Sequence, residues 1–310
     1  MRGQTYIGGR DIYRDFGVVI TKGGYNDLLN YNEIKEPVSN DWPEYHGVEV
    51  DLSAVYLNNR VVNISFYGID LVKTELFLDF LQSQNGMVLS STFLTKGYQL
   101  RLLNSETLKA YRKGQREFSL TFMEDIPQRY TYIPVGYQKI IPDAGIFIDH
   151  VRLKSLGLAF TGSNQAFLRR GEAKENLTRS IETSDGTIYD TAGGYKEVAN
   201  EIMLPLAFYI KGDPVQKPKP GDFNDDYNGD FKITRWLQTI RRADMSTFVA
   251  CYESFLGLLT QPGEHTVSHK GISKKCYYKS ASDFNIISVN PDIVVSFNLT
   301  LILTHSELNP

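Results

Sequence analysis

An internal repeat constrains this chain more than any other feature of its sequence. The run Phe16–Ile20 matches Leu156–Phe160 at an offset of 140, with a glycine in second place in both. The pairs Tyr6-Ile7 and Ile146-Phe147 precede these runs at the same offset, and Phe66-Tyr67 matches Phe208-Tyr209 at an offset of 142. A repeat of this length predicts two copies of one fold, each of about 145 residues.

The order of the later matches agrees with this duplication. Phe77–Leu81 before Gly86 corresponds to Phe255–Leu259 before Gly263, and Phe118–Phe122 corresponds to Phe297–Leu301. Prolines at 127, 134 and 142 punctuate an aromatic-rich junction. We therefore expect two domains, residues 1–142 and residues 143–310.

The second copy is longer than the first. Tyr67 and Gly86 are 19 residues apart, whereas Tyr209 and Gly263 are 54 apart, so the second copy carries 35 extra residues. Lys211–Tyr227 contains three prolines among glycine and aspartate. This composition predicts an exposed loop or extended arm at about residues 211–243.

The sequence predicts a mainly β fold with flanking helices. Tyrosine, phenylalanine and tryptophan make up 12% of the chain, and these residue types favour pleated, half-buried surfaces. Short alternating segments indicate mainly antiparallel strands. They are Gly47–Leu57, Val61–Tyr67, Tyr98–Leu103, Glu117–Phe122, Met203–Ile210, Cys276–Lys279 and Asp292–Leu303. Each copy is expected to be a β-sandwich or barrel of two short sheets with one helix.

Two segments have the helical period instead. In Asp244–Leu259 the apolar residues recur every three or four positions, with Asp244 as the N-cap and Pro262-Gly263 beyond the end. Leu71–Gln84 repeats this pattern in the first copy, with Asp70 as its cap. We expect one flanking helix in each copy, between the central strands and the later strands.

Several protein classes are disfavoured by composition. The net charge of −3 gives no global attraction for nucleic acid or anionic lipid, and the two cysteines cannot form a disulfide framework. The sequence shows neither a secretory signal nor an apolar run of 18 residues. We expect a protein without a membrane segment, folded in the cytoplasm.

No catalytic, cofactor-binding or metal site is predicted, and the chain is not expected to be an enzyme. Glycine-rich phosphate loops, nucleophile elbows and the His-Glu-x-x-His motif are absent from the sequence. Three groups of residues give weaker signals. They are zinc at Glu264, His265, His269 and Cys276, a general base at His46 beside Asp41 and Glu44, and a cation loop at Asp222–Asp230. A solvated hairpin, a surface loop and a hydrophilic turn are the favoured interpretations.

The segment Asp41–His46 combines Trp42 and Tyr45 with charged neighbours in a long loop. Tryptophan and tyrosine beside charges are typical anchors of protein interfaces. We consider both an interface role and an ordinary loop for this segment.

The N-terminal run Tyr6–Ile20 resembles the opening of phage distal tail and tail-tube-like proteins. It places a short strand, a Gly8-Gly9 turn with polar residues, and then Phe16-Gly17 before an aliphatic strand. In that family a domain is a β-sandwich with a helix on its flank, and six domains form a ring around the tail channel. Chains with two such domains resemble baseplate hub proteins, in which three copies form a pseudo-sixfold ring.

The resemblance implies a structural component of a phage or prophage tail. The expected partners are further copies of the chain, as a trimer or hexamer, and other tail proteins such as the tail tube and the tip or spike. DNA would be met only by passage through the channel, and the location would be the virion tail. The 310 residues leave no room for a separate carbohydrate-binding domain, unless the insertion replaces it.

Two other functions remain open at this point. A β-sandwich that binds carbohydrate or protein for adhesion would use the aromatic residues as stacking platforms, with Trp42 as the first candidate. An enzyme would depend on His46 or on the pair His265 and His269.

Overall fold

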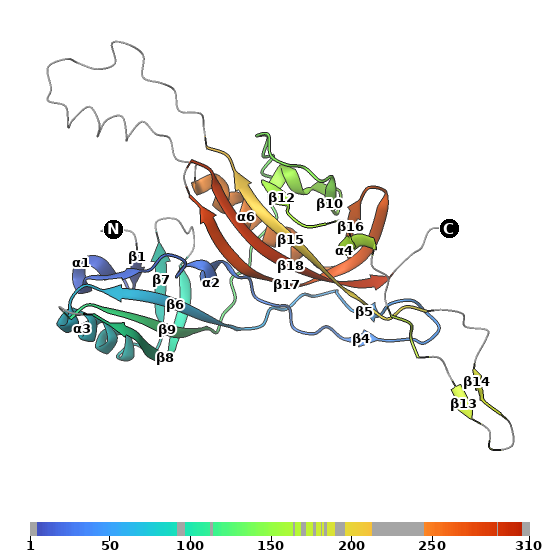
Figure 1. Cartoon of the computed structure of the whole chain (residues 1–310), viewed down its shortest axis with the longest axis horizontal. Coiled ribbons are helices and arrows are strands. Elements are labelled where there is room, and N and C mark those ends of the chain that lie inside the picture. Colours follow the sequence, from blue (N-terminus) through green and yellow to red (C-terminus); the bar gives the residue numbers. More distant parts are fainter. Residues whose placement is uncertain are drawn as a thin grey trace, which may run out of the picture.

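The computed structural model describes residues 5–91, 97–111, 114–163, 165–168, 172–175, 178–180, 182, 185–189, 196–212, 245–289 and 291–305. Within them the chain is mainly β, with two half-barrel sheets and few helices (Figure 1). The predicted insertion at about 211–243, including the candidate cation loop, lies almost wholly outside the described residues.

The first sheet contains seven strands in the order β2-β1-β7-β8-β9-β6-β3. Its strands are β1 (Thr5–Ile7), β2 (Arg10–Asp11), β3 (Val18–Ile20), β6 (Arg60–Gly68), β7 (Met87–Ser91), β8 (Tyr98–Ala110) and β9 (Arg116–Glu124). All of the neighbouring pairs are antiparallel. The short helix α1 (Ile12–Phe16) and the longer α3 (Leu71–Gln82) complete this part.

The second sheet also contains seven strands, in the order β11-β10-β16-β17-β18-β15-β12. Its strands are β10 (Ile146–Ile148), β11 (Val151–Arg152), β12 (Leu158–Phe160), β15 (Glu201–Ile210), β16 (His265–His269), β17 (Ile272–Ser288) and β18 (Ile293–His305). The 3-10 helix η2 (Leu153–Leu156) replaces α1, and α6 (Met245–Leu259) replaces α3.

The two sheets have the same strand order, strand for strand, so the chain contains two repeats of one fold. Each forms one seven-stranded sheet rather than the two short sheets expected. Asp125–Gly145, which joins the repeats, contains no helix or strand. Among the described residues, no helix has the length and apolar character needed to cross a bilayer.

Strand pairing corrects two of the offsets read from the sequence. Phe66 pairs with Phe118 while Leu206 pairs with Phe297, so β6 and β15 correspond at an offset of 140 rather than 142. Likewise Thr5 pairs with Ser91 and Ile146 pairs with His269, so Ile7 is equivalent to Ile148 at an offset of 141. The matches Phe16–Ile20 and Phe118–Phe122 keep their predicted offsets.

The turn after the first strand shows how different residues form the same geometry. Gly8 and Gly9 have φ of 56° and 79°, and the equivalent Asp149 and His150 have φ of 48° and 66°. Two successive positive φ values make the type I′ turn that connects a tight hairpin. In both repeats the first turn residue donates its N–H to the neighbouring strand, at 3.0 Å to Val88 O and 3.0 Å to Thr266 O.

The predicted helices pack against the sheets and fill the two cores. The Asp70 carboxylate caps α3 by accepting the Lys73 N–H at 2.9 Å, as expected, while Asp244 lies outside the described residues. Phe77 of α3 and Phe255 of α6 are equivalent and fully buried. Each lies beside the aromatic rings of the central strands, Phe66 and Phe118 or Phe208 and Phe297.

One strand prediction is wrong. In Gly47–Leu57 only β5 (Glu49–Val50) is a strand, and the remainder is loop with an isolated bridge at Leu57. Its alternation comes from contacts with the second repeat, where Leu52 and Leu57 join the core.

Candidate functional site: the contact between the repeats

Two long loops occupy equivalent places in the repeats. Loop 1, residues 21–59, joins β3 to β6, and loop 2, residues 161–200, joins β12 to β15. Each begins with a four-residue helix, α2 (Asn26–Leu29) or α4 (Gln165–Leu168). Each then forms a two-stranded hairpin, β4 (Ser39–Asn40) with β5 or β13 (Thr178–Ser180) with β14 (Thr187–Tyr189). The pairs Ser39–Val50 and Thr178–Tyr189 fall at one offset, 139, so the two hairpins are equivalent.

The stems of the two loops are also the same. In loop 1, Lys35 N donates to Tyr56 O at 2.7 Å and Asn58 N donates to Glu33 O at 2.8 Å. In loop 2 the equivalent bonds run from Lys174 N to Lys196 O at 2.8 Å and from Val198 N to Glu172 O at 2.9 Å. Ile34 and Ala173 occupy the equivalent central position of each stem.

The loops differ in what they contact. Loop 1 leaves the first repeat and runs along the second, so that β4 and β5 lie below the end of β18 (Figure 1). Loop 2 leaves the second repeat in the corresponding direction, and its hairpin β13–β14 projects away from the body at the lower right of Figure 1.

Loop 1 docks on an edge of β17 that the sheet leaves open. β16 pairs with β17 only over Ile272–Cys276, so the next residues of β17 have no β16 neighbour. There Tyr31 N donates to Ala281 O at 2.9 Å and Ile34 N donates to Lys279 O at 3.1 Å. The loop therefore extends the sheet, as an added strand does in β-augmentation.

A group of tyrosines fills the space between loop 1 and the second repeat. The Tyr31 ring lies 5.7 Å from that of Tyr130 and 6.0 Å from that of Tyr278. The Tyr252 hydroxyl donates to Leu29 O at 2.8 Å, and the Tyr278 hydroxyl donates to Asn32 O at 3.1 Å. Burial raises the pKa of Tyr252 and Tyr278 well above 10 and that of Tyr31 to about 12, so these hydroxyls stay protonated and act as donors.

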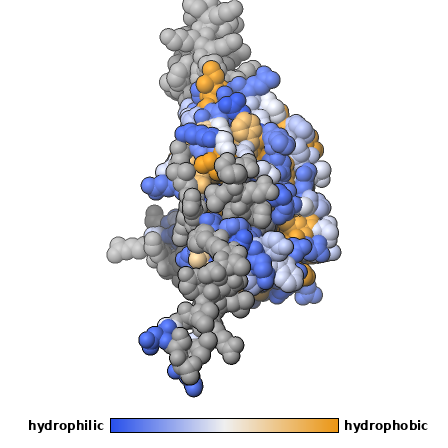
Figure 2. Space-filling view, turned by 90° about the vertical axis from the view of Figure 1, so that its right-hand side faces the viewer, coloured by the Kyte–Doolittle hydropathy of each residue, from blue (hydrophilic) through white to orange (hydrophobic). Residues whose placement is uncertain are grey.

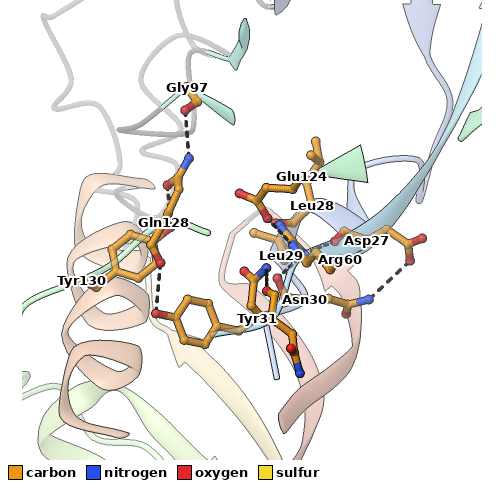
Figure 3. A network of polar contacts seen from close by, with 12 residues as sticks. Asp27, Leu28, Leu29, Asn30, Tyr31, Arg60, Gly97, Glu124, Gln128 and Tyr130 are labelled. Carbon is orange, nitrogen blue, oxygen red and sulfur yellow. Dashed lines mark hydrogen bonds and ion pairs between the residues drawn. The ribbon is translucent and has the colours of Figure 1, made fainter. Parts of the chain in front are cut away.

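An arginine fixes the start of loop 1 (Figure 3). The guanidinium of Arg60 donates to the carbonyls of Asp27, Leu28 and Asn30 at the end of α2. Its Nε also lies 2.5 Å from the buried carboxylate of Glu124. Burial is the largest single effect and would lower the pKa of Arg60, but the charge and hydrogen bond of Glu124, together with Tyr98 and Tyr252, outweigh it and raise the pKa. Arg60 therefore remains a cation that satisfies carbonyls left open by the helix end.

The far part of loop 1 is bonded to the opposite end of the second repeat. Val48 N donates to Thr304 O at 2.9 Å, and Leu52 O accepts from Gly263 N at 2.9 Å. Ile34, Leu52 and Leu57 are buried in the same core cluster as the second sheet. The contact thus spans the length of loop 1 and combines backbone bonds with apolar burial.

The segment Asp41–His46 forms an interface, within this chain, with the stem of loop 2. The Lys174 ammonium donates to Trp42 O at 2.7 Å and Gly47 O at 2.6 Å, and it pairs with the Asp41 carboxylate. The His46 ring accepts the Glu197 N–H at 3.2 Å through Nδ1. Asp41 and His46, considered above as a base and its partner, therefore hold loop 2. Trp42 itself remains 48% exposed.

The four residues considered for zinc do not converge. His265 and His269 are both buried on β16, but four residues along a strand separate them by about 13 Å. The Nδ1 atom of His265 lies 2.5 Å from the Asp149 carboxylate and its Nε2 lies 3.0 Å from Leu259 O. The His269 ring packs on Phe167 at 4.8 Å. Among the described residues no group of three histidine, cysteine, aspartate or glutamate side chains could hold a metal ion.

Sequence reasoning missed Arg60, Glu124 and the tyrosines as parts of one contact. They come from β6, β9, loop 1, the joining segment Asp125–Gly145, α6 and β17, so no local spacing connects them. The sequence holds one signal of this contact, which is the charged residue Arg60 at the start of an alternating apolar strand. Comparisons with family models, curated proteins and solved structures find no match to this chain.

Proposed function

We propose that this protein is a structural component of a phage or prophage tail, of the distal tail or baseplate hub type. It forms a ring that connects the tail tube to the tail tip. Its role is mechanical, and the two repeats act as two neighbouring sectors of the ring wall.

The observation that carries this proposal is the direction of the contact between the repeats. Loop 1 of the first repeat binds the sheet of the second, while the equivalent loop 2 points away from the other side of the second repeat. Such a contact joins two different surfaces of one fold, so it is heterologous. Heterologous contacts repeat from unit to unit and form a ring when the rotation closes. Three chains would supply six sectors.

The open strand edges support the same conclusion. A protein that stays monomeric blocks its edges, because exposed backbone donors and acceptors pair with other chains. In the second repeat the edge of β17 is covered by loop 1. A ring covers the corresponding edge of the first repeat with the next chain.

The experiment has two stages. Light scattering after size-exclusion chromatography, with negative-stain microscopy, should give three or six chains in a particle with a central hole. Antibodies against the chain should then label one site, the distal end of the tail tube, on particles from a producing strain. A chain that stays monomeric at high concentration overturns the ring, and rings without labelled tails overturn the tail role.

A further inference from the structure

We propose that loop 2 of one chain docks on β8 of the first repeat of a second copy of this chain, with the stem residues Glu172–Glu175 lying along the strand edge at Leu103. This inference rests on the ring proposed above and names the surfaces that form it. It follows from three features of the first repeat.

The first feature is an open edge at the equivalent place. β7 pairs with β8 only over Tyr98–Leu100, just as β16 pairs with β17 only to Cys276. By sheet register Leu103 is equivalent to Lys279, whose carbonyl accepts the Ile34 N–H. Among the described residues no strand lies along this edge of β8 beyond Leu100.

The second feature is the exposure of the residues there. In the second repeat Tyr278 is 1% exposed and Ala281 is fully buried, because loop 1 covers them. In the first repeat Leu102, which is equivalent to Tyr278, is only partly buried, and Leu103 beside it is 44% exposed. The face that loop 1 covers in the second repeat is therefore partly open in the first.

The third feature is complementary charge and shape. Arg101 is equivalent to Tyr277, which lies beside Glu36 of loop 1, and Glu36 is equivalent to the exposed Glu175 of loop 2. Docking in the same manner brings Glu175 to Arg101, whose guanidinium bonds Asp125 at 2.9 and 3.0 Å in its own chain and would be shared by the two carboxylates. The first repeat also has a surface hollow, which is lined by Gly86, Met87, Val88, Gln99, Arg101 and Asp125. It lies at the place equivalent to the one where residues 48–52 of loop 1 contact the second repeat.

Loop 2 has the donor that this edge requires. Ile34 N–H bonds to β17, whereas the equivalent Ala173 N–H has no partner among the described residues. Ala173 and Glu175 are exposed, while Lys174 is held by Trp42 O and Gly47 O, which orients the stem. Figure 2 views the side from which loop 2 projects, and its coloured surface is largely hydrophilic with small, separate apolar areas. A contact there depends on backbone pairing and a few apolar side chains rather than on a broad apolar patch.

Cysteine cross-linking between separately purified chains tests this proposal. Leu103→Cys and Ala173→Cys chains, one of them carrying a size tag, are mixed and treated with a short bismaleimide cross-linker, which does not require the two side chains to face each other. We expect the mixed cross-linked dimer to exceed both homodimers at least tenfold, and a chain with both substitutions to give a ladder of higher oligomers. The native cysteines do not interfere, because Cys251 and Cys276 are fully buried.

Two controls fix the interpretation. Leu76→Cys on α3 is 54% exposed in the same repeat but away from the β8 edge, and its mixture with Ala173→Cys should give no excess. Wild-type chain without added cysteines should give no cross-link, because Cys251 and Cys276 are buried. Ala173→Pro removes the N–H donor that the docking uses, so it should lower the ring fraction at least tenfold with an unchanged melting temperature, and Glu175→Arg should lower the cross-linking yield.

The possible outcomes separate this inference from the proposed function. Rings without the 103–173 cross-link would overturn the docking surface and leave the ring intact. A specific cross-link in a protein that labels no tails would support the surface and refute the tail role. Chains that neither assemble nor cross-link would refute both.

Discussion

Replacing Arg60 by methionine tests whether the contact between the repeats depends on the buried cation. The change removes the partner of Glu124, whose side chain is 1% exposed, and also the donors to three carbonyls at the end of α2, those of Asp27, Leu28 and Asn30. Removing one partner of a buried ion pair costs about 3–5 kcal/mol, because the remaining charge is left without compensation. We therefore expect R60M to lower the free energy of unfolding by about 4 kcal/mol.

The second repeat suggests how to divide this loss into its causes. Leu303 occupies the position equivalent to Glu124, so leucine fits this place in the fold. The double variant R60M/E124L removes the buried charge and leaves only the carbonyls without the cation. Because an unsatisfied buried carbonyl costs about 1–3 kcal/mol and water can reach this partly open helix end, we expect a residual loss of about 1–2 kcal/mol.

Equilibrium urea unfolding followed by far-ultraviolet circular dichroism measures these losses. Amide exchange of Tyr31 and Ile34, which bond to β17, reports on the docking of loop 1 itself and should speed up in R60M. Arg116→Met is the matched control, because its ion pair with Glu75 is exposed and should contribute less than about 1 kcal/mol. The reasoning is refuted if R60M costs no more than this control, or if E124L recovers nothing in the R60M background.

Three further predictions concern other parts of the fold. Gly257→Ala should lower the free energy of unfolding by about 1–3 kcal/mol, because the new Cβ would lie 2.4 Å from the Thr131 carbonyl carbon. The control Gly86→Ala places its Cβ where nothing lies within 4 Å, so it should be neutral in the same unfolding assay. Native Cys251 and Cys276 should react with a thiol reagent at neutral pH far more slowly than the urea-unfolded chain, since burial raises the pKa of each to about 12; equal rates would contradict this. Burial alone would raise the pKa of Asp149, but the hydrogen bonds that its carboxylate accepts from His265 and from the Thr266 amide lower this pKa below the ordinary 3.8. The carboxylate therefore stabilises the fold above pH 3.8, and this contribution is lost as the pH falls through the lowered pKa. Stability of the wild type relative to Asp149→Asn should therefore decrease in acid, and a constant difference between pH 7 and pH 2 would exclude this role.

The repeat shows where sequence patterns succeed and where they stop. The matches around Gly17 and Gly157 were placed correctly because each glycine ends a short helix with a positive φ, which fixes its position to the residue. The match of Phe66 to Phe208 was two residues out of register. A shift of two keeps every side chain on the same face of a strand, so alternation alone cannot detect it.

By itself the sequence determined the local elements and their repetition. Helices α3 and α6 and the strands β6, β9, β15 and β18 follow from apolar periods of 3.6 and 2, which report burial of one face whatever it is buried against. Of β8 and β17 the pattern predicts only Tyr98–Leu103 and Cys276–Lys279, because both strands continue with bulges that interrupt the alternation. Only the tertiary structure decided what loop 1 packs on. Gly47–Leu57 has the alternation of a strand, yet it packs as an irregular segment on another repeat, and Arg60 meets Glu124 across 64 residues of chain. Such contacts depend on backbone groups and on residues distant in sequence, and neither leaves a local pattern.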